Sequence, residues 1–516
     1  MRDAEIGVFV LIIFVFSNHY RGIIAQTVAA HQCKVVLKRA ATHWITSPFK
    51  FRQRIGTGVN QVVDSPAAIM VLEALVNGGN SYESGAIDRH NQIFFYKSSK
   101  FLSSAQIHCA RTSQLCGMNI NGKTTSAEIF TDNIEQSALD WITELCDHPA
   151  MEGVPIVQMP DVHAGSSCNV GTAYPIGMYV NPDHVGVDIG CTISIHRLSF
   201  AINPNDFPLL DHRIREVIPT GTDICQKNSL NEKELFRFLN SQYQKARSAT
   251  PDLINEAPRI DGRFITDFCR RIKLQEGIFY KSLGTLGGGN HFIEYGEDSE
   301  LGDGWLTIHC GSRNLGVKVA NHWRNIAQNP KRAKYIGYLW GDALRGYLSD
   351  MIIAQAYALF NHQIIRDRIF AILKKLCKAK CTESIFTTHN YISVTDDVPM
   401  LRKGAIDASE GRKVAIPFNM RDGIAICIGK GNEQWFNTAP HGAGRIMSRA
   451  QAKKQISLNE FENSMAGIYS SSVCAGTLDE SPMAYKPTGE ILELIRPTVE
   501  VIAMIKPKLN IKDNGE

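Results

Sequence analysis

Asp188 and Cys191 lie three residues apart in the segment VGVDIGC and could direct a carboxylate and a thiolate toward one point. The glycines of this segment permit a tight turn between them. Such a pair could bind a metal ion, or it could be a capping aspartate beside a buried cysteine. Asp161 and His163, in the upstream segment MPDVH, leave the same choice between ligands and turn residues.

Three further histidines, His291, His309 and His389, each lie beside an apolar run or a glycine loop. A single histidine in such a place is more often a core or surface residue than a ligand. Three of them together with Asp188 and Cys191 favour a binuclear metal site, because borderline metals prefer imidazole and thiolate while a carboxylate adds charge. In such a site a Cys191 thiolate could bridge both metals.

His441 begins a third pattern, HGAGR, which ends at Arg445 and continues to Arg449. The glycines would let a phosphate approach the backbone, and arginines bind phosphoryl oxygens through two nitrogen atoms at once. The pattern therefore predicts a phosphate site, the alternative being a solvated basic helix after a turn. It is neither a Walker loop, which needs Gly-Lys-Ser/Thr after the glycines, nor a dinucleotide-binding fingerprint, which needs a strand–helix–strand context.

Short strands are predicted beside most of these polar residues, where a rigid sheet would hold the side chains in a shared cleft. They cover residues 155–159, 185–189, 306–310, 385–391, 414–420 and 424–429. The spacing of apolar residues predicts one helix between 126 and 146, capped by Thr125 or Ser126. It predicts a second, core helix from Leu344 to Leu376.

Residues 1–113 carry mixed signals and are expected to be an irregular extension of unknown role, whereas residues 114–516 contain all the candidate site residues. The composition, 44% hydrophobic and 21% charged, is typical of a folded globular protein and excludes a largely disordered chain. The net charge is only +4, so any nucleic-acid contact must come from local clusters. No apolar run approaches the roughly 18 residues of a membrane span, so we expect no membrane partner.

The cysteines favour a reducing compartment. There are 13 of them, an odd number without the dense, even spacing of a disulfide framework. The apolar run Ile6–Phe16 resembles the hydrophobic part of a secretory signal, but Asp3 and Glu5 precede it and no small-residue cleavage site follows. We therefore expect a cytoplasmic protein, with secretion or organelle targeting as the alternative.

Taken together and in order, seven segments resemble the RtcB family of RNA ligases. They are MPDVHAG, VGVDIGC, GTLGGGNHFIE, HCGSRNLG, THNY, RKGA and APHGAGRIMSRAQAKK, and the resemblance runs from about residue 127 to the C-terminus. It implies an α+β fold, with a single catalytic domain at 114–516 whose central β-sheets surround a binuclear metal cleft. It covers nothing before about residue 113.

The resemblance also implies an activity. The family joins RNA 3′-phosphate or 2′,3′-cyclic phosphate ends to 5′-hydroxyl ends, using GTP and two manganese ions, through a guanylyl-histidine intermediate. The biological setting would be RNA repair or transfer-RNA splicing. The expected partners are RNA ends and GTP, and an activating protein partner is left open.

Matching the family motifs position by position assigns roles to residues of this chain. Asp188, Cys191 and His291 resemble the ligands of one metal, and Cys191, His309 and His389 those of the other. His441 matches the guanylylated histidine. Asn290, Glu294, Tyr485 and Lys512 resemble guanylate-binding positions, and Arg313, Arg445 and Arg449 fall where RNA or triphosphate oxygens would be held.

The chain also departs from the family pattern. Ser166 and Ser167 stand where the family often has lysine and glycine, Thr192 replaces a glycine, and the loop IPGSM reads IPFNM, with Phe418 and Asn419. These departures bear on nucleotide selectivity and on the preferred RNA end. Two other functions are compatible with the ligand set, a binuclear metallophosphoesterase or nuclease and a non-catalytic RNA-binding relative. Guanylylation of His441 would distinguish the ligase from both.

Overall fold

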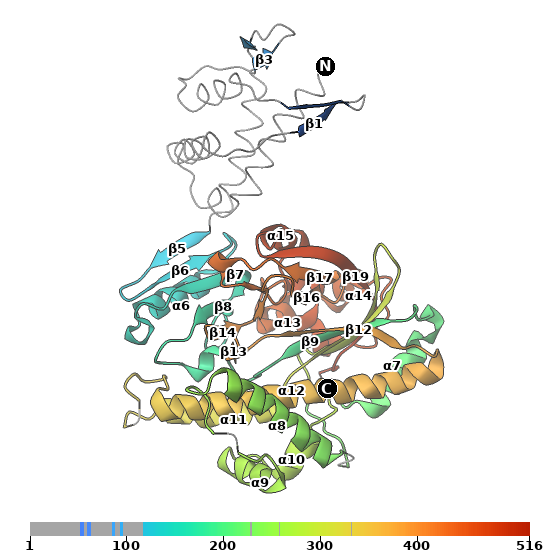
Figure 1. Ribbon diagram of the computed structural model, residues 1–516. Helices are drawn as coiled ribbons and strands as arrows, with labels where there is room; N and C mark the ends of the chain where they lie inside the picture. The colour runs from blue at the N-terminus through green and yellow to red at the C-terminus, as the bar shows by residue number, and fades with distance from the viewer. Residues whose placement is uncertain are drawn as a thin grey trace. The chain divides into compact units, whose positions relative to one another are not determined.

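The computed structural model describes residues 117–515, apart from 228–229, 257 and 332, together with four short strands before residue 117. These strands form two antiparallel pairs, β1 (Arg52–Ile55) with β2 (Val59–Val62) and β3 (Gly85–Ile87) with β4 (Ile93–Phe95). The chain divides into two compact units, Met1–Cys116 and Gly117–Glu516. The apolar run at residues 6–16 lies outside the described residues. Figure 1 shows the larger unit as a mixture of sheets and helices, so the predicted α+β class is confirmed.

A seven-stranded antiparallel sheet forms the centre of the larger unit. In spatial order its strands are β12 (Cys381–Thr388), β9 (Thr192–Leu198), β11 (Gly304–Cys310), β10 (Phe292–Asp298), β19 (Val499–Ile511), β17 (Gly423–Gly429) and β16 (Lys413–Asn419). The two edge strands touch each other, and the backbone N of Ala415 donates to Thr387 Oγ1 at 2.9 Å. The sheet therefore curls almost into a barrel, and Ile193, Ile195 and Trp305 belong to the buried apolar cluster formed by its strands.

A second, six-stranded sheet lies beside the first (Figure 1). Its order is β13 (Tyr391–Ser393), β14 (Met400–Lys403), β8 (Val170–Pro175), β7 (Ile156–His163), β6 (Ser126–Ile129) and β5 (Met118–Asn121). Only the pair β6 and β7 is parallel within this sheet. A short pair, β15 (Ala405–Asp407) with β18 (Thr438–Pro440), leads the chain into the segment that starts at His441.

The helices cover the sheets. They are α6 (Gln136–Asp147), α7 (Phe207–Val217), α8 (Glu232–Ala249), α9 (Gly262–Arg271), α10 (Glu276–Lys281), α11 (Arg313–Ala327), α12 (Gly341–Leu376), α13 (Arg449–Gln455), α14 (Leu458–Ser464) and α15 (Thr488–Leu494). The predicted long core helix is confirmed as α12, which contacts α7, α8, α11 and β11. None of the helices in the described residues is long and apolar enough to cross a membrane.

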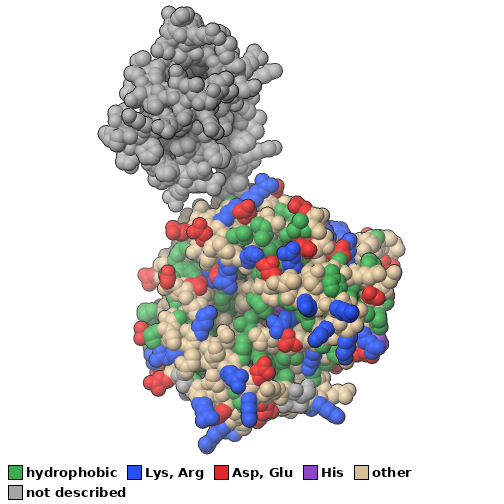
Figure 2. Space-filling model, turned by 45° about the vertical axis from the view of Figure 1, so that its right-hand side comes forward, with side chains coloured by type: hydrophobic (Ala, Val, Ile, Leu, Met, Phe, Trp, Pro, Cys, Tyr) green, Lys and Arg blue, Asp and Glu red, His purple; other side chains and the backbone are tan. Residues whose placement is uncertain are grey.

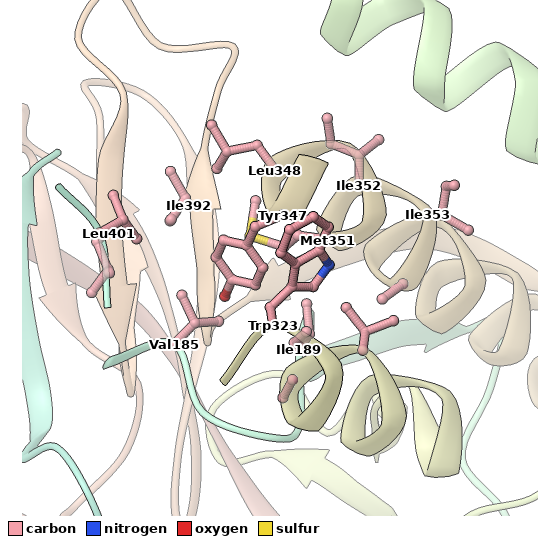
Figure 3. Close-up of a cluster of buried hydrophobic side chains, with 14 of the residues drawn as sticks. Val185, Ile189, Trp323, Tyr347, Leu348, Met351, Ile352, Ile353, Ile392 and Leu401 are labelled. Carbon is pink, nitrogen blue, oxygen red and sulfur yellow. The ribbon is translucent and has the colours of Figure 1, made fainter. Parts of the chain in front are cut away.

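The core beneath α12 anchors the loop that carries Asp188 and Cys191. Figure 3 shows Val185 and Ile189 of this loop packed among Tyr347 and Met351 of α12 and Trp323 of α11. Val185 and Ile189 are completely buried. Full burial of such a side chain contributes about 1.5–3 kcal/mol, so apolar packing on both sides of Asp188 fixes the loop.

Two sequence predictions are wrong in part. The helix expected from 126 begins only at Gln136, because the alternating burial of Ser126–Ile129 suits β6, which pairs with β5 and β7. The strand expected at 185–189 is a loop, because Gly186 and Gly190 adopt positive φ angles of 86° and 70° that a strand does not accommodate. The other predicted strands correspond to β7, β11, β12, β16 and β17.

Candidate active site

Cys191 lies at the centre of a buried cluster of potential metal ligands. Its Sγ is 3.1 Å from Nε2 of His309 and 3.5 Å from Nε2 of His291. The donor atoms of the three residues all lie within 4.8 Å of one another. They come from the loop before β9, from β11 and from the loop before β10, so the central sheet positions them. One metal ion could contact all three.

Hydrogen bonding fixes the tautomer of His309. Its Nδ1 is 3.0 Å from the backbone oxygen of Asn290. Because a carbonyl oxygen only accepts, Nδ1 carries the proton, and the lone pair of Nε2 faces Cys191. Burial lowers the pKa of His309 and of His389 well below the ordinary value. Both rings are therefore neutral, the form in which imidazole binds metals.

Asp188 extends the cluster on the side of His291. Its Oδ2 is 3.0 Å from Nε2 of His291. Burial opposes ionisation of Asp188, but the charge and hydrogen bond of His291 hold the pKa of the carboxyl below its ordinary value. Gly311 leaves room for this carboxylate, because a Cβ at that position would lie 2.0 Å from Asp188 Oδ1. Asp188 is thus held ionised beside the other ligands.

His389 connects the cluster to His441. Its ring centroid is 5.3 Å from that of His309 and 4.8 Å from that of His441. Within the described part of the chain, Nδ1 of His389 and Nδ1 of His291 are buried without a hydrogen-bond partner. Buried nitrogen atoms rarely lack a partner, and a donor set of cysteine sulfur, imidazole and carboxylate suits a divalent transition metal, which would displace the proton that burial keeps on the Cys191 thiol. The residues present therefore fit a metal centre.

His441 is oriented by Asp161, whose side chain is fully buried in β7. Nδ1 of His441 is 2.8 Å from Oδ2 of Asp161. Since the carboxylate accepts, Nδ1 donates, and Nε2 of His441 keeps its lone pair. The alternative that Asp161 is a turn residue is wrong, because it lies inside a strand. His441 thus has the geometry of an oriented nucleophile.

A cavity of about 550 Å³ lies beside part of the cluster and His441. His309, His389 and His441 line it, whereas Asp188, Cys191 and His291 are not among its lining residues, so two of the potential ligands share a space with the potential nucleophile. The other lining residues include Asn290, Glu294, Arg445, Arg449, Tyr485 and Lys512, as well as Ser166, Phe418 and Asn419. This volume is typical of pockets for small organic ligands. Most residues selected from the sequence therefore share one pocket.

Glu480 forms ion pairs with the cationic groups Lys512 and Arg449 of this pocket. The sequence motifs did not indicate this residue. Its Oε2 lies 3.0 Å from Lys512 Nζ and accepts a hydrogen bond from the Tyr485 hydroxyl at 3.1 Å. Its Oε1 is paired with Arg449. Burial opposes ionisation, but Lys512 and Arg449 lower the pKa of the Glu480 carboxyl to about 2. Glu480 is therefore ionised and holds the surrounding cations in place.

Arg313 does not line the cavity, and it belongs to the other side of the loop that carries His291. Its guanidinium donates to Thr285 Oγ1 at 2.9 Å and to the backbone oxygen of Gly221 at 2.6 Å. A Cβ at Gly287 would meet both Arg313 Nη1 and His291 Nδ1, so the guanidinium lies close behind this metal-ligand candidate. Arg313 therefore stabilises the loop before β10 through its contacts with Thr285 and Gly287.

Charged side chains are mixed over the surface. In Figure 2, Lys and Arg side chains are interspersed with Asp and Glu on the face in view, and several lie together toward its right-hand edge. This distribution agrees with the net charge of +4. On this face, positive charge is thus interspersed with negative charge except toward that edge.

Comparison with known proteins gives a consistent family match. A family model described as tRNA-splicing ligase RtcB matches residues 144–513. The RNA-splicing ligase RtcB of Escherichia coli strain K12 is 28% identical over 368 residues, which cover 65% of this chain and 85% of the relative. The tRNA-splicing ligase RtcB of Nanoarchaeum equitans is 28% identical over 399 residues, covering 66% of this chain and 83% of the relative. The matched region contains all the candidate site residues.

Proposed function

Because the chain belongs to the tRNA-splicing ligase RtcB family, we propose that it joins RNA 3′-phosphate or 2′,3′-cyclic phosphate ends to 5′-hydroxyl ends with GTP and manganese. The observation that carries this proposal is the hydrogen bond between His441 and the buried Asp161, with His441 facing a cavity that His309 and His389 also line. We propose that the reaction serves RNA repair or transfer-RNA splicing in the cytoplasm.

The first step would guanylylate His441. Nε2 attacks the α-phosphorus of GTP, an N–P bond forms, and the P–O bond to pyrophosphate breaks. Asp161 keeps the proton on Nδ1 and stabilises the positive charge that develops on the ring. A 2′,3′-cyclic phosphate would first be hydrolysed, water adding to phosphorus as the bond to the 2′-oxygen breaks, to give a 3′-phosphate. In the second step a 3′-phosphate oxygen of the RNA takes the guanylyl group and frees His441. The 5′-hydroxyl of the other strand then attacks this activated phosphate and displaces GMP.

Other residues of the cavity would bind the reactants. Asp188, Cys191 and His291 would hold one manganese ion, and Cys191, His309 and His389 the other. Bound there, the metals would supply Lewis-acid stabilisation of phosphoryl oxygens. Asn290, Glu294, Tyr485 and Lys512 would bind the guanylate, and Arg445 and Arg449 the phosphate oxygens. Arg313 would act indirectly, through the loop that carries His291.

Covalent labelling tests the proposal. The full chain, loaded with manganese under anaerobic conditions, is incubated with α-labelled GTP. We expect an acid-labile label on the wild type and none on His441→Ala, whereas the surface variant His212→Ala should label normally. Folded, metal-loaded wild type that never labels would contradict the ligase mechanism. Hydrolysis of RNA ends without a label would indicate the phosphoesterase, and RNA binding alone the non-catalytic relative.

A further inference from the structure

Glu294 and Asn510 face each other across neighbouring strands at the cavity. They are direct register partners in the antiparallel pair of β10 and β19. Glu294 and Asn510 are 2% and 1% exposed, and both residues line the cavity. Asn510 Nδ2 donates to Glu294 Oε2 at 2.8 Å. Two polar side chains are therefore buried as a pair in the curled sheet, where apolar residues fill most of the interior.

Each side chain of the pair has one oxygen atom that lacks a hydrogen-bond partner. Among the described residues, Glu294 Oε1 and Asn510 Oδ1 are buried without a hydrogen-bond partner. The orientation of the Asn510 amide follows from its neighbour, because only the NH₂ group can donate to a carboxylate, and its oxygen must then face away from that bond. Two neighbouring residues thus each keep one unused acceptor. Leaving a buried acceptor unpaired is costly, so both atoms require donors from elsewhere.

The ionisation of Glu294 also indicates that the pair needs hydrogen-bond donors from a ligand. Burial raises the pKa of Glu294 to about 8, and the hydrogen bond from Asn510 and the charge of Lys512 offset this only in part. Lys512 itself is paired with Glu480 and lies over the Phe292 ring, 5.5 Å from its centroid. In the described part of the chain no cation is paired with the Glu294 carboxyl, which therefore keeps its proton near neutral pH and loses it when donors from a ligand arrive. Hydrogen-bond donors from a ligand would stabilise the resulting carboxylate.

We infer that Asn510 is a base-reading residue, which together with Glu294 presents two neighbouring acceptors that select guanine; this inference rests on the proposed function. Guanine carries two adjacent donors, N1–H and the 2-amino group. Hypoxanthine lacks the 2-amino group, and adenine offers an acceptor at N1. A site built for two donors rejects a base that leaves one buried acceptor unpaired. Asn510 would act by contacting the base, and not by contacting the phosphates.

Equilibrium binding of nucleoside monophosphates tests this without requiring turnover. The affinities of the full chain for GMP, IMP and AMP are measured by calorimetry for wild type, Asn510→Val and Asn510→Thr. Valine and threonine have the same shape and both suit a strand, but only threonine keeps an oxygen that can accept. We expect the wild type to prefer GMP over IMP by about tenfold or more. The preference should fall to within about twofold in Asn510→Val and recover in part in Asn510→Thr.

Controls separate this inference from the proposed function. Asn119→Leu, on the exposed strand β5, should keep the wild-type preference, and thermal unfolding verifies that each variant is folded. An unchanged GMP-to-IMP ratio in both Asn510 variants would overturn the role of Asn510, while labelling of His441 by GTP would leave the ligase proposal standing. Wild type that binds the three nucleotides equally would also overturn the inference. If one Asn510 variant does not fold, the other decides between these outcomes.

Discussion

At the scale of single residues, the site depends on pairs that are far apart in the sequence. His441 could be selected from the glycines and arginines that follow it, because they are its neighbours in the chain. Its partner Asp161 lies 280 positions away, and its hydrogen bond could not be read from local spacing. The same holds for Glu480 and Asn510, whose importance depends on which cations and strands surround them. Residue types therefore indicated the candidate site residues, but not the hydrogen bonds and ion pairs that orient their side chains.

Replacing Asp161 by asparagine tests the orientation of His441. Asparagine keeps the size of the side chain, but its amide can stabilise the wrong tautomer and supplies no negative charge. We expect the rate of guanylylation to fall by about a hundredfold or more, with the manganese content unchanged. Single-turnover labelling and elemental analysis measure the two quantities. A rate within about twofold of the wild type would show that Asp161 does not orient the nucleophile.

At the scale of elements, strands and long helices were predictable where periodicity was regular. The apolar residues of α12 recur over many turns, and the prediction from Leu344 holds to within a few residues. The ligand loop at 185–189 is not the strand that the sequence predicts, because its apolar residues pack in a cluster between α11, α12 and the six-stranded sheet without joining a strand ladder. Short apolar runs do not reveal which neighbour buries them. Tertiary packing therefore decides the shape of the ligand loop.

Gly311, between β11 and α11, offers a test of how closely these elements approach the ligand loop. Alanine at this position would place its Cβ 2.0 Å from Asp188 Oδ1, so the carboxylate has to move. We expect Gly311→Ala to bind manganese at least about tenfold more weakly, because misplaced ligands lower metal affinity. Gly262→Ala is the matched control, since no atom lies within 4 Å of its added Cβ. Equal manganese affinity in both variants, measured by titration, would contradict this account of Asp188.

At the scale of the whole molecule, buried neutral histidines make the fold sensitive to acid. Burial lowers the pKa of His184 to about 3, and its Nδ1 lies 2.6 Å from the Tyr174 hydroxyl. In the unfolded chain a histidine titrates near 6.5. The unfolded state therefore binds a proton first, so stability is full above pH 6.5 and is lost as the pH falls toward 3. This one residue accounts for a loss on the order of a few kcal/mol.

Urea unfolding of the metal-free protein between pH 7 and pH 4 measures this effect. A chelator is present, because metal binding is itself pH-dependent and would add to the slope. We expect the free energy of unfolding of His184→Asn to depend less steeply on pH than that of the wild type. His212→Asn, an exchange at an exposed histidine, should keep the wild-type slope. Identical slopes for wild type and His184→Asn would refute the assignment.

Strand β19 comes at the end of the family region, yet it lies in the middle of the seven-stranded sheet, between β10 and β17. During synthesis the earlier strands leave the ribosome with a gap where β19 belongs. Residues 293–298 on β10 and 424–429 on β17 then lack their partners, and both open strand edges could pair with another chain. The cavity beside His441 can be completed only after translation has passed Lys512, which lines it. The nascent chain therefore needs protection from aggregation at these two strand edges until β19 has been synthesised and has joined the sheet.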